Sequence, residues 1–452
     1  MSHQPKLTPL RPIHTEPGAR ETLVDRWVQP LVRFLHVEAA SGVVLLAATA
    51  VALLLANSPA AAAFATIWET RVGLTLGGFQ LYKPLLLWIN DGLMSIFFFV
   101  VGLEIKRELV AGELRDPRNA ALPMAGALGG MIVPAVTYLV LQRGQPGQAG
   151  WAIPMATDIA FVVGVLALLG SQVPSGLKIF LLSLAIVDDL GSVLIIGLVF
   201  TAHLSLVALG LAGVGVGVML LFNRIGVRHV AVYVFVGAGV WLAVLKSGLH
   251  PTIAGVVLGL LTPARAWLGD QVLMEVVKDA AQRLRDRERT GTAPHDPEAI
   301  YALATTAHET IAPLERLETT LHPWVAFLIM PLFALANAGV SIDLAGLGHP
   351  VATAVAAGLT LGKPLGIVLV SWGVVQLGLA RLPDGVHWKS MLGAGCLGGI
   401  GFTMSLFIAG LALDGDVLTA GKIGTLTGSV LSALLGVVLL ATFLVPRAQN
   451  TE

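Results

Sequence analysis

The stretch LKIFLLSLAIVDDLGSVLIIGLVF at residues 177–200 decides the solvent in which this chain folds. Its charged side chains are Lys178 near the start and two adjacent acids, Asp188 and Asp189, at the centre. A run of about 20 apolar residues is the length that a helix needs to cross the hydrocarbon core of a bilayer. A carboxylate there costs about 2.5 to 3.5 kcal/mol on an insertion scale. We therefore predict a transmembrane helix with a functional acid pair.

Apolar runs of similar length recur along the chain. The 452 residues are 55% hydrophobic and 12% charged, roughly half the charged fraction of an average soluble protein. We predict an all-α integral membrane protein of about twelve transmembrane helices. They are expected near residues 39–57, 84–105, 120–141, 150–170, 176–200, 205–222, 229–247, 250–263, 323–341, 350–375, 386–411 and 423–445.

The basic residues predict the orientation of these helices. With both termini in the cytoplasm, 22 of the 28 Lys and Arg residues fall on the inner side, five on the outer side, and Lys363 inside a helix. The positive-inside rule favours this orientation. We expect one membrane domain at 38–446 between cytoplasmic tails at 1–37 and 447–452, with no cleaved signal peptide at the polar start.

Two connections are long. The outer loop 58–83 contains VGLTLGGFQLYK, whose alternation predicts a hairpin suited to a subunit contact. The inner loop 264–322 contains VLMEVVKDAAQRLRDRER, which predicts a surface helix facing either water or lipid headgroups. Its apolar residues on one helical face are Val272, Val276, Val277, Ala280 and Leu284.

Four ionisable residues stand in predicted helices: Asp158 in IPMATDIAFVVG, Asp188, Asp189, and Lys363 in GLTLGKPLGIVL. Successive helical residues point about 100° apart, so one ligand cannot treat both acids of the pair equally. One carboxylate is expected to coordinate a hard cation such as sodium, and the other to pair with Lys363. Coupled titration of the two acids would let a proton replace the cation. The alternative, charges at helix ends that reach water, fits the pair poorly.

Two predicted helices are expected to be interrupted. Pro154, Thr157 and Asp158 fall early in the fourth, and GAGCLGGIGFTMS at 393–405 gives the eleventh five glycines between residues 393 and 401. Interrupted helices in corresponding positions of two halves point to the binding site of a transporter. Close helix packing is the alternative explanation for the glycines.

Six segments together identify a family. They are WINDGLMSIFFFVVGLEIKREL (88–109), AIPMATDIAF (152–161), AIVDDLGSVLI (185–195), LHPWVAFLIMPLFALANAGV (321–340), GKPLGI (362–367) and GIGFTMSLFIA (399–409). Through these segments the chain resembles the NhaA family of bacterial Na⁺/H⁺ antiporters, one of the families from which the interrupted-helix rule was drawn. The resemblance extends from about residue 35 to 445.

The resemblance implies twelve helices in two inverted repeats, with the interrupted helices crossing at mid-membrane. Their partial charges would be balanced by Asp158 and Lys363. It also implies that Asp188 and Asp189 bind the cation and the protons, that Thr157 contributes nearby, and that Lys363 is the partner of Asp188. The implied function is electrogenic, pH-regulated export of Na⁺ or Li⁺ in exchange for H⁺, without a cofactor, by a homodimer in the bacterial inner membrane.

The family further implies pH control from the cytoplasmic side. The corresponding residues are Glu104, Arg107 and Glu108 at the inner end of the second helix, Glu318 and His322 before the ninth, and His250 in GLHPTIAG. The first group could equally be a positive-inside anchor, and His250 a helix cap. Thr319 follows Glu318 where many members have a histidine, which bears on the pH setpoint.

Two other classes of function compete with antiport. A transporter of the same fold that moves an organic anion would need uncancelled positive charge, which the acid pair argues against. A membrane enzyme or channel has little support, because the sequence contains neither a nucleotide-binding glycine loop followed by lysine nor His and Glu at metal-site spacing. A net charge of zero argues against a nucleic-acid partner, and the single Cys396 can form no disulfide within the chain.

Overall fold

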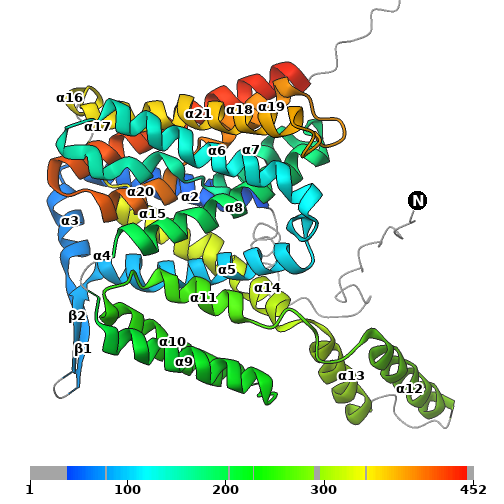
Figure 1. Ribbon diagram of the computed structural model, residues 1–452. Helices are drawn as coiled ribbons and strands as arrows, with labels where there is room; N and C mark the ends of the chain where they lie inside the picture. The colour runs from blue at the N-terminus through cyan, green and yellow to red at the C-terminus, as the bar shows by residue number, and fades with distance from the viewer. Residues whose placement is uncertain are drawn as a thin grey trace, which may run out of the picture.

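The computed structural model describes residues 38–76, 79–201, 204–227, 229–289, 296–341 and 344–444. Most helices lie side by side in one bundle (Figure 1). A hairpin of β1 (Arg71–Leu76) and β2 (Phe79–Pro84) projects from one end, and α12 (Asp270–Arg289) and α13 (Pro297–Thr310) from the opposite end (Figure 1). The two long loops therefore lie at opposite ends of the bundle (Figure 1). The predicted tails at 1–37 and 447–452 lie outside the described residues.

Eight helices of the described chain are long and apolar enough to cross a bilayer. They are Leu85–Val110 (α4, η1, α5), Pro117–Leu141 (α6), Ser175–Val199 (α8), Leu206–Arg224 (α9), Val230–Ser247 (α10), Pro313–Asn337 (α14, η5, α15), Pro350–Gln376 (α17, η6, α18) and Gly415–Leu444 (α21). Three of them contain a π-helical segment, at Trp88–Leu93 (η1), Val325–Ile329 (η5) and Gly358–Gly362 (η6).

Three bent helix pairs raise the number of spans to as many as eleven. They are α2 (Glu38–Ala56) with α3 (Ala61–Glu69), bent by 115°, η3 (Pro146–Met155) with α7 (Ile159–Leu169), bent by 45°, and α19 (Trp388–Gly398) with α20 (Phe402–Ala412), bent by 47°. The predicted eighth helix, α11 (Thr252–Leu261), has only ten residues. The count of twelve and the inverted repeat therefore stay predictions. Short helical turns complete the fold at η2 (Glu113–Arg115), η4 (Gly170–Gln172) and α16 (Leu344–Leu347).

The predicted interruptions of the fourth and eleventh helices are confirmed, and the two breaks meet. The Asp158 amide donates to the Ile400 carbonyl at 2.7 Å, and the Thr157 hydroxyl donates to the Gly398 carbonyl at 2.9 Å. Backbone groups freed where a helix stops must find partners inside a membrane protein. Each break supplies partners to the other, which fixes the crossing point.

Glycines bring two pairs of helices into backbone contact. A Cβ atom added at Gly129 of α6 would meet the Gly366 carbonyl of α18, and one at Gly366 would meet the Gly129 carbonyl. Gly255 and Gly259 of α11 lie in the same way against the backbone of α5. Small residues permit this close approach of membrane helices.

The long loops differ in part from expectation. The predicted hairpin forms, with Arg71 opposite Pro84 and Leu76 opposite Phe79, but α3 in the same loop was not predicted. The inner loop holds two helices, of which α12 covers the predicted surface segment. Val276 and Ala280 of α12 are at least partly shielded, whereas Val272 and Val277 are each 40% exposed. The predicted apolar face is therefore only partly covered, and the side chain of Leu284 lies outside those described.

The predicted start of the ninth helix at residue 323 was wrong. The helix begins at Pro313, so Glu318 and His322 lie within α14 rather than before it. Proline suits the first helical position because its missing amide hydrogen is not needed there. The polar composition of this first part of the helix concealed it in the sequence.

Candidate ion-binding site

Helix α8 carries the two adjacent acids into the centre of the bundle. Asp188 and Asp189 are 0% and 1% exposed. Lys363 of α18 is equally buried, and its Nζ lies 2.6 Å from Asp188 Oδ2. The predicted pairing of Lys363 with Asp188 is therefore present. Lys363 Nζ also donates to the carbonyl of Met155, the last residue of η3.

Asp158 occupies the crossing of the interrupted helices. It is the N-cap of α7, where its Oδ1 accepts from the Phe161 amide at 3.3 Å. Its Oδ2 accepts from the Thr403 amide at 3.1 Å and from the Thr403 hydroxyl, both in the first turn of α20. Helix N-termini carry partial positive charge. One carboxylate thus accepts hydrogen bonds from the starts of two helices, and Lys363 lies at the end of η3.

Several buried oxygens at this site have no hydrogen-bond partner among the described residues. They include Asp188 Oδ1, Asp189 Oδ1 and Ser192 Oγ, all on α8. Thr157 lies near Asp188, and Asp158 lies within electrostatic range of Asp189. Unpaired buried polar atoms are costly, and carboxylate and hydroxyl oxygens are the ligands of hard cations. The arrangement can therefore hold either a small cation or protons.

A cavity of about 400 Å³ lies beside the C-terminal end of α5 and the N-terminal part of α8. Its walls are formed by Glu108, Ala111, Gly112, Glu113, Asn119, Ile179, Leu182 and Ser183. Ser183 is little more than one helical turn from Asp188 along α8. The cavity lies at the end of the bundle at which α12 and α13 project (Figure 1), and Ser183 points to the other side of α8 from Asp188.

The structure divides the predicted pH-sensing residues into two places. Arg107 of α5 forms an ion pair with Glu318 of α14 and lies 3.8 Å from Glu108. Glu104 and His322 are within electrostatic range of Glu318. These five residues therefore form one cluster where α5 meets α14.

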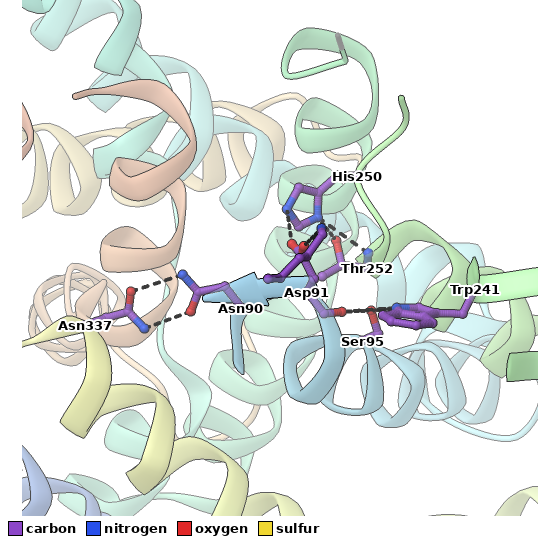
Figure 2. Close-up of polar contacts among 8 residues, drawn as sticks. Asn90, Asp91, Ser95, Trp241, His250, Thr252 and Asn337 are labelled. Atoms are coloured by element: carbon purple, nitrogen blue, oxygen red, sulfur yellow. Dashed lines mark hydrogen bonds and ion pairs between the residues drawn. The ribbon is translucent and has the colours of Figure 1, made fainter. Parts of the chain in front are cut away.

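His250 lies apart from that cluster, before α11. Its Nε2 is 3.8 Å from Asp91 Oδ1, and its Nδ1 is 2.7 Å from the Thr252 hydroxyl (Figure 2). Asp91 in turn pairs with Lys83 of β2 at 2.7 Å. His250 is thus joined to the hairpin end of the molecule.

Sequence reasoning missed the polar residues around Asp91. The amides of Asn90 and Asn337 face each other, with a contact of 2.9 Å, and link η1 to α15 (Figure 2). Trp241 Nε1 donates to Ser95 Oγ at 3.0 Å (Figure 2). The sequence feature that could have revealed them is the presence of one acid, Asp91, and two amides, Asn90 and Asn337, within apolar helices. Thr403 and Ser192 were also missed, because a hydroxyl in an apolar run is an ordinary feature.

Comparison with known proteins identifies the family. Residues 32–440 match the family described as Na⁺/H⁺ antiporter 1. The chain is 51% identical over 417 residues to a Na⁺/H⁺ antiporter NhaA of Rhodopirellula baltica, covering 92% of this chain and 94% of the relative. It is 49% identical to NhaA 1 of Acidiphilium cryptum, covering 95% of each, and 46% identical to NhaA of Rhizobium meliloti, covering 94% and 97%.

The buried acid pair fits a multi-pass membrane transporter, and so does the similarity to NhaA antiporters over nearly the whole length of this chain. The chain belongs to the NhaA family of Na⁺/H⁺ antiporters and exchanges sodium ions for protons.

Proposed function

We propose that Asp188 and Asp189 form the site at which Na⁺, or Li⁺, competes with two protons. Asp189 supplies the main charged ligand of the cation. Asp188 joins it when its bond to Lys363 loosens. The observation that carries this proposal is the buried acid pair, in which each carboxylate retains one oxygen without a hydrogen-bond partner among the described residues.

Competition between Na⁺ and protons follows from the burial of two neighbouring carboxylates. Two neighbouring carboxylates repel each other in a low-dielectric interior, and either a cation or protons relieve this repulsion. A site loaded with two protons carries one more positive charge than the same site loaded with one Na⁺. Exchange between these two states moves one net charge in each cycle, so transport is electrogenic.

Lys363 keeps the charge at the site low in both states. Its ammonium group neutralises one carboxylate when the cation is absent, since it lies 2.6 Å from Asp188. Thr157 and Asp158 set the shape of the site, because both are bonded to the opposite break. Asp158 accepts three hydrogen bonds from the starts of α7 and α20, so its role is structural and proton exchange is assigned to the pair on α8.

The cluster of Glu104, Arg107, Glu108, Glu318 and His322 controls the pH dependence of exchange from the cytoplasm. Its support is the ion pair between α5 and α14, two helices that a change of charge would draw together or release. His250 contributes from the hairpin end, where Asp91 lies beside it.

The chain is placed in the bacterial inner membrane with both termini in the cytoplasm. The 22 basic residues of the expected inner segments support this orientation. The projecting β1–β2 hairpin is the contact between two subunits of a homodimer. Its place at the end of the bundle leaves its edges open to a second copy (Figure 1).

An electrical measurement tests the two-proton exchange. Proteoliposomes adsorbed on a solid-supported membrane receive a jump in Na⁺ concentration at equal pH on both sides. We expect a transient current that disappears in Asp189→Asn, because the amide keeps the shape of the side chain and removes its charge. Unaltered exchange in Asp189→Asn would remove this residue from the mechanism. Exchange seen with a pH-sensitive dye but without current would contradict the two-proton stoichiometry.

A further inference from the structure

Helix α8 presents a third buried oxygen beside its two acids. Ser192 is 1% exposed, and its hydroxyl has no hydrogen-bond partner in the described part of the chain. Hydroxyl groups inside helices commonly bond to the carbonyl four residues earlier. Ser95 does so at 2.5 Å, and the buried Thr425 does so at 2.9 Å. The free hydroxyl of Ser192 is therefore available to another ligand.

Helix geometry places this hydroxyl over the acid pair. At about 100° per residue, Ser192 points in a direction about 40° from Asp188 and about 60° from Asp189, and so between them. It lies about 4.5 to 6 Å farther along the helix axis. Helical side chains lean toward the N-terminus, which is the direction of the acids. Helix geometry thus directs the side chains of these three residues, each with an oxygen that lacks a partner among the described residues, toward the same side of α8.

We propose that the Ser192 hydroxyl is a neutral ligand of the transported cation and sets its affinity and selectivity. This inference rests on the assignment of Asp188 and Asp189 as the cation site. A hydroxyl offers lone pairs to a hard cation but takes up no proton near neutral pH. Ser192 therefore strengthens cation binding and leaves proton binding almost unchanged.

The same ligand favours sodium over lithium. Selectivity between hard cations depends on the size of the site and on the number of ligands. Li⁺ is smaller than Na⁺ and is satisfied by fewer oxygens. Removing one oxygen from the set should therefore weaken Na⁺ binding more than Li⁺ binding.

A matched control is available in Ser371 of α18. Its hydroxyl is also buried and also without a partner among the described residues. Its hydroxyl lies beside Gly126 of α6, next to the side chains of Leu184 and Phe180 of α8. These neighbours are apolar, and both come before the acid pair along α8. Ser371→Ala removes a similar buried oxygen that does not face the acid pair.

The test measures apparent KM for Na⁺ and for Li⁺ in proteoliposomes containing the full-length protein, with a pH-sensitive dye. In Ser192→Ala we expect KM for Na⁺ to rise about tenfold, the effect of losing roughly 1.4 kcal/mol of binding. KM for Li⁺ should rise less, and the rate at saturating Na⁺ should stay near wild type. Ser192→Thr restores a hydroxyl and should recover most of the Na⁺ affinity. Ser371→Ala should match wild type.

Other outcomes overturn the inference. An unchanged KM for Na⁺ in Ser192→Ala, or an equal rise in Ser371→Ala, would show that Ser192 is not a ligand. A second measurement does not depend on transport activity and can be made if Ser192→Ala is produced in small amounts. It records the Na⁺ concentration that protects the detergent-solubilised protein against heat, which should be lower for wild type than for Ser192→Ala. Equal protection counts against the proposal. Asp189→Asn separates the two hypotheses. If it transports normally, the site itself is wrongly placed, whereas loss of transport there with an unchanged Ser192→Ala rejects only Ser192.

Discussion

At the scale of single residues, Lys363 connects the acid pair to the break in the fourth predicted helix. Its ammonium group contacts both Asp188 and the Met155 carbonyl, and no part of it is exposed. A buried charge that loses its partner is strongly destabilising, whereas removing both partners costs much less. The pair is thus a structural element as well as a part of the proposed ion site.

Lys363→Ala should lower the stability of the protein and shift its pH profile. Asp188 would lose its charged partner inside the bundle, at a cost of about 3 kcal/mol or more. Heat-induced loss of monodispersity in detergent measures the first effect, and dye-monitored exchange across a pH series measures the second. The double variant Asp188→Asn/Lys363→Ala should be less heat-sensitive than the two single losses added together. Wild-type stability and an unchanged pH profile in Lys363→Ala would speak against the pairing.

The charged residues of the site could be predicted from the sequence, whereas two of its neutral residues, Thr403 and Ser192, could not. Asp158, Asp188, Asp189 and Lys363 stand out because an ionisable group in an apolar helix is costly and therefore rare. Thr403 gives no such signal, although it holds Asp158 with two hydrogen bonds. A threonine bonded to its own helix and one bonded across a crossing look alike until the helices are placed.

At the scale of elements, the same physical rule explains one success and one failure. Proline and glycine mark places where a regular helix cannot continue, and the breaks before α7 and α20 fall at them. The early start of α14 went unnoticed because Pro313 can also begin a helix. The first part of that helix carries charges that are typical of a loop, and its ion pair with α5 shows that it is packed against the bundle.

The contact between α5 and α14 leads to a prediction about pH control. Glu318→Gln removes the charge that holds Arg107, so the midpoint of the pH–activity curve should move while the maximal rate is retained. Exchange measured from pH 6 to 9 in proteoliposomes records both quantities. His322→Ala should also move the midpoint, because His322 lies within electrostatic range of Glu318. Glu298→Gln on α13 is the control, since it changes an exposed carboxylate away from α5.

If both Glu318→Gln and His322→Ala titrate like wild type, the cluster does not sense pH. A shift of equal size in Glu298→Gln would indicate a general effect of net charge. A loss of maximal rate without a shift in the midpoint would instead place Glu318 on the route of the ions.

At the scale of the whole molecule, the proposed exchange of two protons for one sodium ion would couple sodium transport to the membrane potential. A potential of 100 mV supplies roughly 2.3 kcal/mol for each elementary charge. Since 1.4 kcal/mol corresponds to a factor of ten, one net charge per cycle can maintain a sodium gradient of about fifty-fold. A cell with a negative interior could therefore expel sodium even at equal pH on both sides.

This coupling can be measured directly. In proteoliposomes at symmetric pH, a potassium–valinomycin potential, negative inside, should drive radioactive ²²Na⁺ out of the vesicles. Reversing the potential should reverse the flux, and Asp189→Asn should abolish the response. Sodium movement that ignores the imposed potential would indicate that one proton is exchanged for each cation.

The contact between Gly129 and Gly366 has a mechanical consequence. Two helices whose backbones touch through glycine have little room to shift against each other, so we expect α6 and α18 to move together. Lys363 is one turn from Gly366 and would travel with this pair. The glycines of α11 join it to α5 in the same way. Any motion that opens the site to alternate sides of the membrane must then use other joints, and the non-helical residues beside Asp158 and Ile400 are the natural hinges.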